Sequence, residues 1–284
     1  MPETIGLSWP VFFAVLFGAL LHASWNALVK SSTDKSLDMA VIHLIGSVLA
    51  IPLVALIGWP DAAAWPFIAA SVLIHIAYYI ATTQAYQHGD LGLTYPLMRG
   101  VAPLLVALSA TFTLHETLTP LAWAGIVGIS CGVLVLGLSR SALHAPKAVG
   151  FALANAVIIA IYTVVDALGV RASGNALQYV ATLFLFDGWP FALLMFARRG
   201  RAMGVYARQR WPVATVGALA SLGSYGIALW AMTRAPVATV AALRETSVLF
   251  AVLIGVWLLK EAFTLRRLFG TCAIVGGVMA IRLA

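Results

Sequence analysis

The sequence predicts an all-α integral membrane protein with ten transmembrane helices arranged as two inverted five-helix repeats. Three observations lead to this fold class: an apolar composition, ten stretches long enough to cross a bilayer, and a correspondence between the two halves of the chain. Of the 284 residues, 62% are hydrophobic and only 10% are charged. Soluble domains are about 45–50% apolar and about 25% charged, so this composition excludes a water-soluble fold as well as a disordered chain.

Ten apolar stretches follow one another along the chain. A helix needs about 20 apolar residues to cross the hydrocarbon layer, whereas barrel strands alternate in polarity and cross with about 10. These stretches are long and uniformly apolar, which favours helices. In chain order they cover residues 8–29, 38–57, 66–86, 91–113, 119–138, 147–170, 175–196, 211–232, 236–258 and 264–283.

Short polar segments separate the predicted helices. Residues 88–90 separate the third helix from the fourth, and residues 233–236 separate the eighth from the ninth. The longest predicted connection, 197–210, contains five arginines, and we expect them to meet lipid headgroups rather than nucleic acid. Prolines inside helices mark expected bends, at Pro52, Pro96, Pro103 and Pro190.

The basic residues predict how the chain is oriented. Twelve of the seventeen lysines and arginines lie on alternate connections at one side of the membrane, and three lie on the other side. The remaining two, Arg99 and Arg244, lie inside predicted helices. Basic connections stay in the cytoplasm. We therefore expect a multi-pass protein of the bacterial inner membrane with both termini in the periplasm.

The two halves of the chain match when one is shifted by 145 residues. Arg99 then falls on Arg244 and Glu116 on Glu261, and Gly125 and Gly132 fall on Gly270 and Gly277. We expect repeats at residues 1–143 and 144–284. Five helices per repeat is an odd number, so the second copy enters the membrane upside down. Inverted repeats are typical of secondary transporters that bind substrate near the midplane.

These strings carry a family resemblance over essentially the whole chain. LHETLT and LKEAFT, each before a glycine-rich helix, resemble the repeat signature of the ten-span EamA-type branch of the drug/metabolite transporter superfamily. TYPLMRGVAPLL and YTVVDALGVRASGNA resemble it too. The resemblance implies a transporter that exports amino acids, drugs or other metabolites. His115 and Lys260 replace the glycine that usually precedes each junction glutamate, a change that bears on the turn.

Five charged residues within the predicted helices are candidates for function, because a charge at the bilayer centre costs about 2.5 kcal/mol or more. They are Arg99, Asp166, Asp187, Arg244 and Glu245. In one interpretation an arginine binds a substrate carboxylate, and the acids bind an amine or carry a proton. In the other interpretation the five residues pair with one another and hold the halves together. The sequence leaves both open.

Aromatic side chains inside the predicted helices suggest a cavity for amphipathic or aromatic solutes. A tyrosine hydroxyl facing lipid would be unsatisfied, so a mid-helix tyrosine should face protein or water. His75, Tyr79, Thr82 and Tyr86 share one helical stripe. With the two arginines, the predicted substrate-binding residues are Trp25, His75, Tyr78, Tyr79, Tyr95, Arg99, Tyr162, Tyr225, Trp230 and Arg244.

The fifth and tenth predicted helices consist almost wholly of small and aliphatic residues. Gly128 and Gly132 allow another helix to approach closely, so packing is their expected role. Cys131 and Cys272 are expected to be small buried hydrophobic residues. The sequence has no metal-binding spacing, and we expect neither a metal nor a cofactor.

Together these features predict a secondary transporter that exports small metabolites by alternating access. Aromatic or other neutral amino acids are the favoured substrates, because a dianionic solute would need more deep basic residues than two. Drugs or other metabolites remain the alternative substrates, and a channel or scaffold is a less favoured alternative. We find no enzyme motif and expect no catalytic activity. The expected partners are a small-molecule substrate and the lipid bilayer, and the expected state is a monomer.

Overall fold

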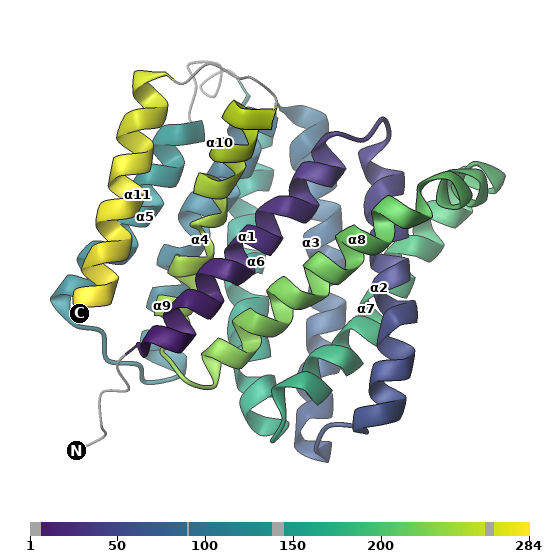
Figure 1. Ribbon diagram of the computed structural model, residues 1–284, viewed down its shortest axis with the longest axis horizontal. Coiled ribbons are helices and arrows are strands. Elements are labelled where there is room, and N and C mark those ends of the chain that lie inside the picture. Colours follow the sequence, from purple (N-terminus) through teal and green to yellow (C-terminus); the bar gives the residue numbers. More distant parts are fainter. Residues whose placement is uncertain (1–6, 90, 138–144, 259–263) are drawn as a thin grey trace.

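The computed structural model describes residues 7–89, 91–137, 145–258 and 264–284, and these residues contain helices and no strand (Figure 1). The elements are α1 (Trp9–Lys30), α2 (Lys35–Ile57), the 3₁₀ turn η1 (Ala62–Ala64), α3 (Trp65–His88), α4 (Leu91–Thr113), α5 (Pro120–Gly137), α6 (Pro146–Ala172), α7 (Ala176–Arg199), α8 (Arg201–Met232), α9 (Val237–Arg244), α10 (Ser247–Leu258) and α11 (Leu265–Leu283). Helices α9 and α10 together occupy the ninth predicted stretch.

The predicted helices are therefore confirmed, with one wrong boundary. Helix α7 continues to Arg199 and α8 begins at Arg201, so the connection expected over 197–210 is almost entirely helical. Gly200 alone separates the two helices, at a φ of 52° that glycine adopts without steric cost. Arginine, glutamine, alanine and methionine are good helix formers, so the basic segment continues α8 beyond the apolar stretch.

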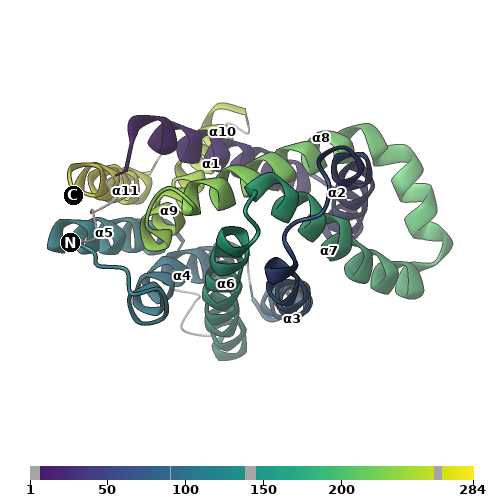
Figure 2. The same ribbon diagram turned by 90° about the horizontal axis from the view of Figure 1, so that it is seen from below.

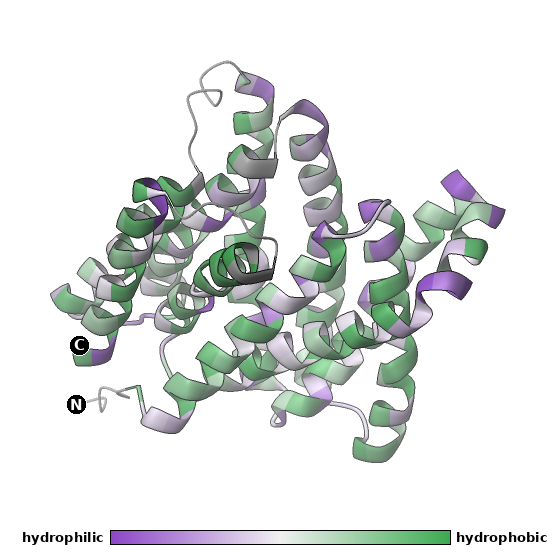
Figure 3. Ribbon diagram, turned by 45° about the horizontal axis from the view of Figure 1, so that its top comes forward, coloured by the Kyte–Doolittle hydropathy of each residue, from purple (hydrophilic) through white to green (hydrophobic). Residues whose placement is uncertain are grey.

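The surface of the molecule is apolar and part of its interior is polar. Large hydrophobic side chains such as Phe13, Leu56 and Phe112 are exposed over 60%, 83% and 75% of their surface. Asn155 and Asp166, in contrast, are completely buried. Figure 3 shows hydrophilic residues mainly near helix ends, for example where α7 meets α8. Nine segments of the described chain are long and apolar enough to cross a bilayer. Helix α11, which corresponds to the tenth predicted crossing, is apolar and has arginines near its ends.

A contact between the first and last helices shows that their outer ends share one face of the molecule. The guanidinium carbon of Arg282, near the end of α11, lies 3.8 Å from the centre of the Trp9 ring at the start of α1. The first and last helices thus have these ends on one face, the lower side of Figure 1, as an even number of crossings requires. We call the opposite face the basic face, defined by Lys30, Lys35 and Arg199.

The helices pack in pairs that relate the two halves. Helix α5 packs on α11 and α2 on α7, while α3 packs on α6 and α1 on α8. Helices α1 and α8 lie side by side (Figure 2) and run obliquely across the view of Figure 1. With five crossings in each half, the first crossing (α1) corresponds to the sixth (α6). The third (α3) corresponds to the eighth (α8). Under the predicted inverted repeat, the α1–α8 and α3–α6 contacts are counterparts.

The closest helix approach lies between α5 and α11. An added Cβ at Gly125 would lie 2.7 Å from the Gly277 carbonyl oxygen, and one at Gly132 would lie 2.7 Å from that of Gly270. The shift of 145 residues converts the first contact into the second. The helices are antiparallel, because the early glycine of α5 meets the late glycine of α11. Cys131, however, is exposed on the outer surface.

The expectation of buried cysteines is therefore wrong, for Cys272 as well as for Cys131. The glycine edges of α5 and α11 face each other, so neighbouring positions turn outward. An outward position of this apolar surface suits a small hydrophobic thiol.

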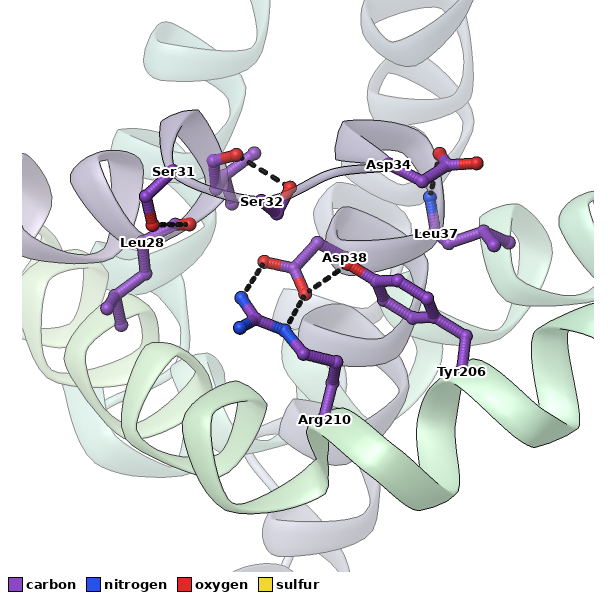
Figure 4. Close-up of polar contacts among 9 residues, drawn as sticks. Leu28, Ser31, Ser32, Asp34, Leu37, Asp38, Tyr206 and Arg210 are labelled. Atoms are coloured by element: carbon purple, nitrogen blue, oxygen red, sulfur yellow. Dashed lines mark hydrogen bonds and ion pairs between the residues drawn. The ribbon is translucent and has the colours of Figure 1, made fainter.

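A buried carboxylate joins α2 to the basic extension of α8. Asp38 is completely buried, and both of its oxygens accept hydrogen bonds from Arg210 at 3.3 Å (Figure 4). The Tyr206 hydroxyl donates to the same carboxylate at 3.1 Å. Asp34 caps α2 through the Leu37 N–H. These contacts fix the helical extension to the body of the protein.

Candidate substrate-binding site

A cavity of about 70 Å³ lies among eight helices drawn from both halves. Aromatic rings and charged or hydroxyl groups line it. The lining residues are His22, Trp25, Met39, His43, His75, Tyr78, Tyr79, Arg99, Tyr162, Leu183, Phe184, Asp187, Ser221, Ser224, Tyr225 and Arg244. Helices α5, α10 and α11 contribute none of these residues.

Eight of the ten predicted substrate-binding residues line this cavity. They are Trp25, His75, Tyr78, Tyr79, Arg99, Tyr162, Tyr225 and Arg244. Tyr95 and Trp230 do not line it: both pack against the hydrophobic core, and Trp230 lies 4.9 Å below the guanidinium of Arg234. The sequence placed these two in the right helices, but their rotation about the helix axis turns them elsewhere.

Arg99 and Glu245 form an ion pair at one end of the cavity. The distance from Arg99 Nε to Glu245 Oε2 is 2.8 Å, and the side chains are 9% and 5% exposed. Arg99 Nη2 has no hydrogen-bond partner among the described residues. Glu245 has no acidic counterpart in the first half, because the matching position is Gly100. An added Cβ at Gly100 would lie 2.7 Å from Leu134 Cγ, so that position is closed to a side chain.

Arg244 ends the short helix α9 at the same end of the cavity. Its guanidinium carbon lies 5.4 Å from the centre of the Tyr225 ring, a cation–π distance. The helix breaks directly after it, where the N–H groups of Glu245 and Thr246 bond three residues back. Interrupted helices near the midplane often form transporter binding sites. A second cavity of about 10 Å³, close to the size of one water, borders both arginines.

Hydrogen-bond acceptors occupy the other end of the cavity, on α2, α3 and α7. The Tyr79 hydroxyl donates to Asp187 Oδ2 at 2.9 Å, and its oxygen lies 3.4 Å from His43 Nδ1. Because the hydroxyl proton is directed at Asp187, the oxygen is left to accept from a protonated His43 Nδ1. His43 Nε2 and Asp187 Oδ1 are buried and have no partner among the described residues. When His43 is neutral and carries its proton on Nδ1, its Nε2 is a hydrogen-bond acceptor, and so is Asp187 Oδ1.

A second acid lies behind the cavity wall. Asp166 is completely buried and accepts hydrogen bonds from the Tyr179 hydroxyl at 2.8 Å and from the Tyr225 hydroxyl. In front of it, His75 stacks on Tyr162 with ring centres 4.5 Å apart. His75 Nδ1 lies 2.9 Å from the Ser71 carbonyl oxygen, an atom that can only accept. Nδ1 therefore carries a proton and Nε2 is the free ring nitrogen.

The charged residues thus divide between the two interpretations. Within the described chain, Arg99 and Glu245 form an ion pair, as the structural interpretation expects. Asp166 and Asp187 accept from tyrosines, and Arg244 contacts a ring. Of the three charged candidates outside this pair, Asp187 and Arg244 line the cavity and are available to a solute, whereas Asp166 lies behind its wall.

Sequence reasoning missed several lining residues, including His43, Phe184, Ser221 and Ser224. A signal existed for His43, because a lone histidine within an apolar helix is unusual and points to function. Serine, phenylalanine and leucine are common in membrane helices and gave no signal. Among the described residues no group of three or more histidine, cysteine, aspartate or glutamate side chains could hold a metal ion.

Comparisons with known proteins agree with this architecture. The sequence profile of the EamA-like transporter family matches residues 146–283. A solved structure titled "Crystal structure of protein" superposes with a TM-score of 0.75 over 96% of this chain and 95% of that one, at 19% identity. That likeness concerns the fold alone. No curated protein matches the sequence. Residues 146–283 of this chain thus match the EamA-like transporter family of the drug/metabolite transporter superfamily, a match that indicates a multi-pass membrane transporter of small molecules.

Proposed function

We propose that this chain exports amino acids with aromatic or other neutral side chains across the bacterial inner membrane by alternating access. The observation that carries the proposal is the composition of the cavity. Arginines lie at one end, an unpartnered carboxylate oxygen lies at the other, and aromatic rings form the walls. A neutral amino acid is a zwitterion that complements both ends, and an aromatic side chain gains from ring contacts.

The ring spacing indicates how such a solute would bind. Tyr162 adjoins the arginines, His75 stacks on it at 4.5 Å, and Tyr79 lies 6.3 Å beyond, next to Asp187. The two charges of an α-amino acid are on adjacent groups. The solute therefore contacts one end directly and reaches the other through water, which bridges polar groups with little loss of enthalpy.

Alternating access follows from two inverted repeats, proposed at residues 1–143 and 144–284. Support comes from the α5–α11 glycine contacts, which the shift of 145 residues interchanges. The boundary itself falls at 138–144, outside the described residues. In this proposal the basic face is cytoplasmic and both termini are periplasmic. The transporter works as a monomer, and Asp166, Asp187 and Glu245 are the candidates for proton coupling.

Counterflow in proteoliposomes tests the proposal. Vesicles loaded with unlabelled phenylalanine should accumulate labelled phenylalanine transiently, and saturation should set in as its concentration rises. Uptake that never saturates would indicate a channel, and saturable uptake of other metabolites or drugs with no amino acid carried would indicate the alternative substrates. Either result would contradict the proposal. Repeating the assay with and without a pH gradient decides whether protons are coupled.

Asp187 offers a sharper version of this test. Replacing Asp187 by Asn keeps the Tyr79 contact but removes the negative charge at the acceptor end. We expect KM to rise about tenfold for phenylalanine and to change little for 3-phenylpropionate, which lacks the amine, since a charge-assisted hydrogen bond contributes about 1.5–3 kcal/mol. Equal effects on both solutes would contradict an amine-binding role.

A further inference from the structure

The side chain of Glu116, which lies outside the cavity, contacts the first residues of helix α9. Its Oε1 accepts a hydrogen bond from the Val237 N–H at 2.8 Å, and its Oε2 accepts from the Ala238 N–H at 3.3 Å. These are among the first N–H groups of the helix, which have no partner within it. The Glu116 side chain is only 10% exposed. A residue of the first half thus caps a helix of the second.

Helix α9 connects this cap to the cavity. It has only eight residues, all of them buried, and its last residue is Arg244. At 1.5 Å per residue, about 10 Å separates the cap from the arginine. After Arg244 the α-helical hydrogen bonds give way to bonds that reach three residues back, and α10 begins at Ser247. The position of the first turn of α9 therefore contributes to where the guanidinium lies.

The cap is itself held in place by two contacts. Arg171 Nη2 lies 3.3 Å from Glu116 Oε1, and Arg171 Nε donates to the Met232 carbonyl oxygen at 3.0 Å. Preceding the cap, His115 has a φ of 54°, in the left-handed region that favours glycine. His115 thus adopts the conformation expected of the glycine it replaces. The ends of α4, α6 and α8 and the start of α9 meet at one carboxylate.

The same geometry explains a pattern in the sequence. Arg99 and Arg244 recur at a spacing of 145 residues, and so do Glu116 and Glu261. Glu116 supports the arginine of the other repeat, not its own. Glu261 lies outside the described residues.

We propose that Glu116 is a positioning residue for transport: by capping α9 it holds Arg244 where it meets the solute carboxylate. This inference rests on the proposed function for the identity of the solute. The mechanical part of the inference is that the position of α9 depends on Glu116. This part does not rest on the identity of the solute. The two parts are therefore tested separately, first without any solute and then by transport kinetics.

Hydrogen–deuterium exchange of the full-length protein, followed by mass spectrometry, tests the mechanical part. In Glu116→Ala the amides of residues 237–244 should exchange about thirtyfold faster than in the wild type, because two capping bonds of about 1 kcal/mol each are lost. Glu116→Gln keeps an acceptor oxygen and should fall between the two. Asp61→Ala is the matched control, because it removes a carboxylate cap from η1 instead. Unchanged exchange over α9 in Glu116→Ala would overturn the proposal.

Transport kinetics test whether Glu116 acts through Arg244. Arg244→Met and Glu116→Ala should each raise KM for phenylalanine about five- to tenfold and change KM for phenethylamine, which has no carboxylate, by less than about twofold. Because both remove the same contact, the double variant should be no worse than Arg244→Met alone.

Multiplicative effects in the double variant, or equal effects on both solutes, would overturn the positioning role. A wild type that carries no aromatic or other neutral amino acid would refute the proposed function, and the exchange experiment would still decide whether Glu116 holds α9. A loss of folding in Glu116→Ala leaves Glu116→Gln, which should show the same selective rise in KM to a smaller extent.

Discussion

The ion pair between Arg99 and Glu245 offers a direct test of how buried charge serves this protein. The perturbation is a cycle of variants: Arg99→Met, Glu245→Leu and the combination of both. Each apolar side chain follows the first part of the one it replaces and carries no charge. The cycle measures what the pair contributes to folding, independently of any solute.

The structure sets the expected magnitudes. The 2.8 Å separation and exposures of 9% and 5% describe a pair removed from water. Removing one partner leaves the other charge buried and uncompensated, which costs about 3–5 kcal/mol. Replacing both partners by apolar residues should restore stability to within about 1–2 kcal/mol of the wild type, because both desolvation costs disappear together.

Equilibrium unfolding of the purified protein in mixed micelles measures these free energies. Single variants that lose less than about 1 kcal/mol would refute the reasoning, and so would a double variant as unstable as the singles. Transport then separates structure from function. Arg99 lines the cavity and its Nη2 has no partner among the described residues. The stable double variant should therefore lose transport of solutes that carry a carboxylate.

Three further predictions follow from the packing. Tyr79→Ala should raise KM for aromatic amino acids about tenfold in proteoliposome uptake, whereas Tyr95→Ala, outside the cavity, should leave KM within about twofold. Gly132→Ala should lose about 1–3 kcal/mol in unfolding experiments, because its Cβ would lie 2.6 Å from Ile274 Cγ1, while Gly128→Ala, with a nearest neighbour at 3.4 Å, should change little. His115→Val should destabilise by about 1–2 kcal/mol and His115→Gly should not, by the same measurement, since a β-branched residue is strained at φ 54°. Similar stability of the paired variants, or equal KM values for the two tyrosine variants, would contradict these expectations.

Most of the fold could be predicted from the sequence, because a bilayer imposes a length and a polarity on each crossing. Every predicted helix is present, and most ends agree within three residues. The exception, 197–210, shows why polarity and secondary structure are separate questions. A basic segment leaves the hydrocarbon layer, yet its residues form helix well, so α8 continues past the membrane boundary. No proline lies at the break after Arg244, so the break could not be predicted from the sequence.

The candidate site was predictable in composition but not in geometry. A buried charge or a mid-helix tyrosine is unusual enough in lipid to be noticed in a sequence, and Arg99, Arg244 and Tyr79 were found in this way. Tyr95 and Trp230 were included by the same reasoning, and His43 was left out. Helical spacing tells which residues share a stripe, whereas the rotation of that stripe depends on neighbouring helices.

The sequence by itself determined the number of crossings, the basic face and the correspondence of the halves, since each depends on composition or spacing along one chain. Only the tertiary structure decided which charges are partners. Arg99 pairs with Glu245 of the other half, while Arg244 lies over Tyr225 and depends on the Glu116 cap of its helix. The ion pair and the Glu116 cap each join residues more than a hundred positions apart. Their geometry depends on how tilted helices pack, which no local pattern encodes.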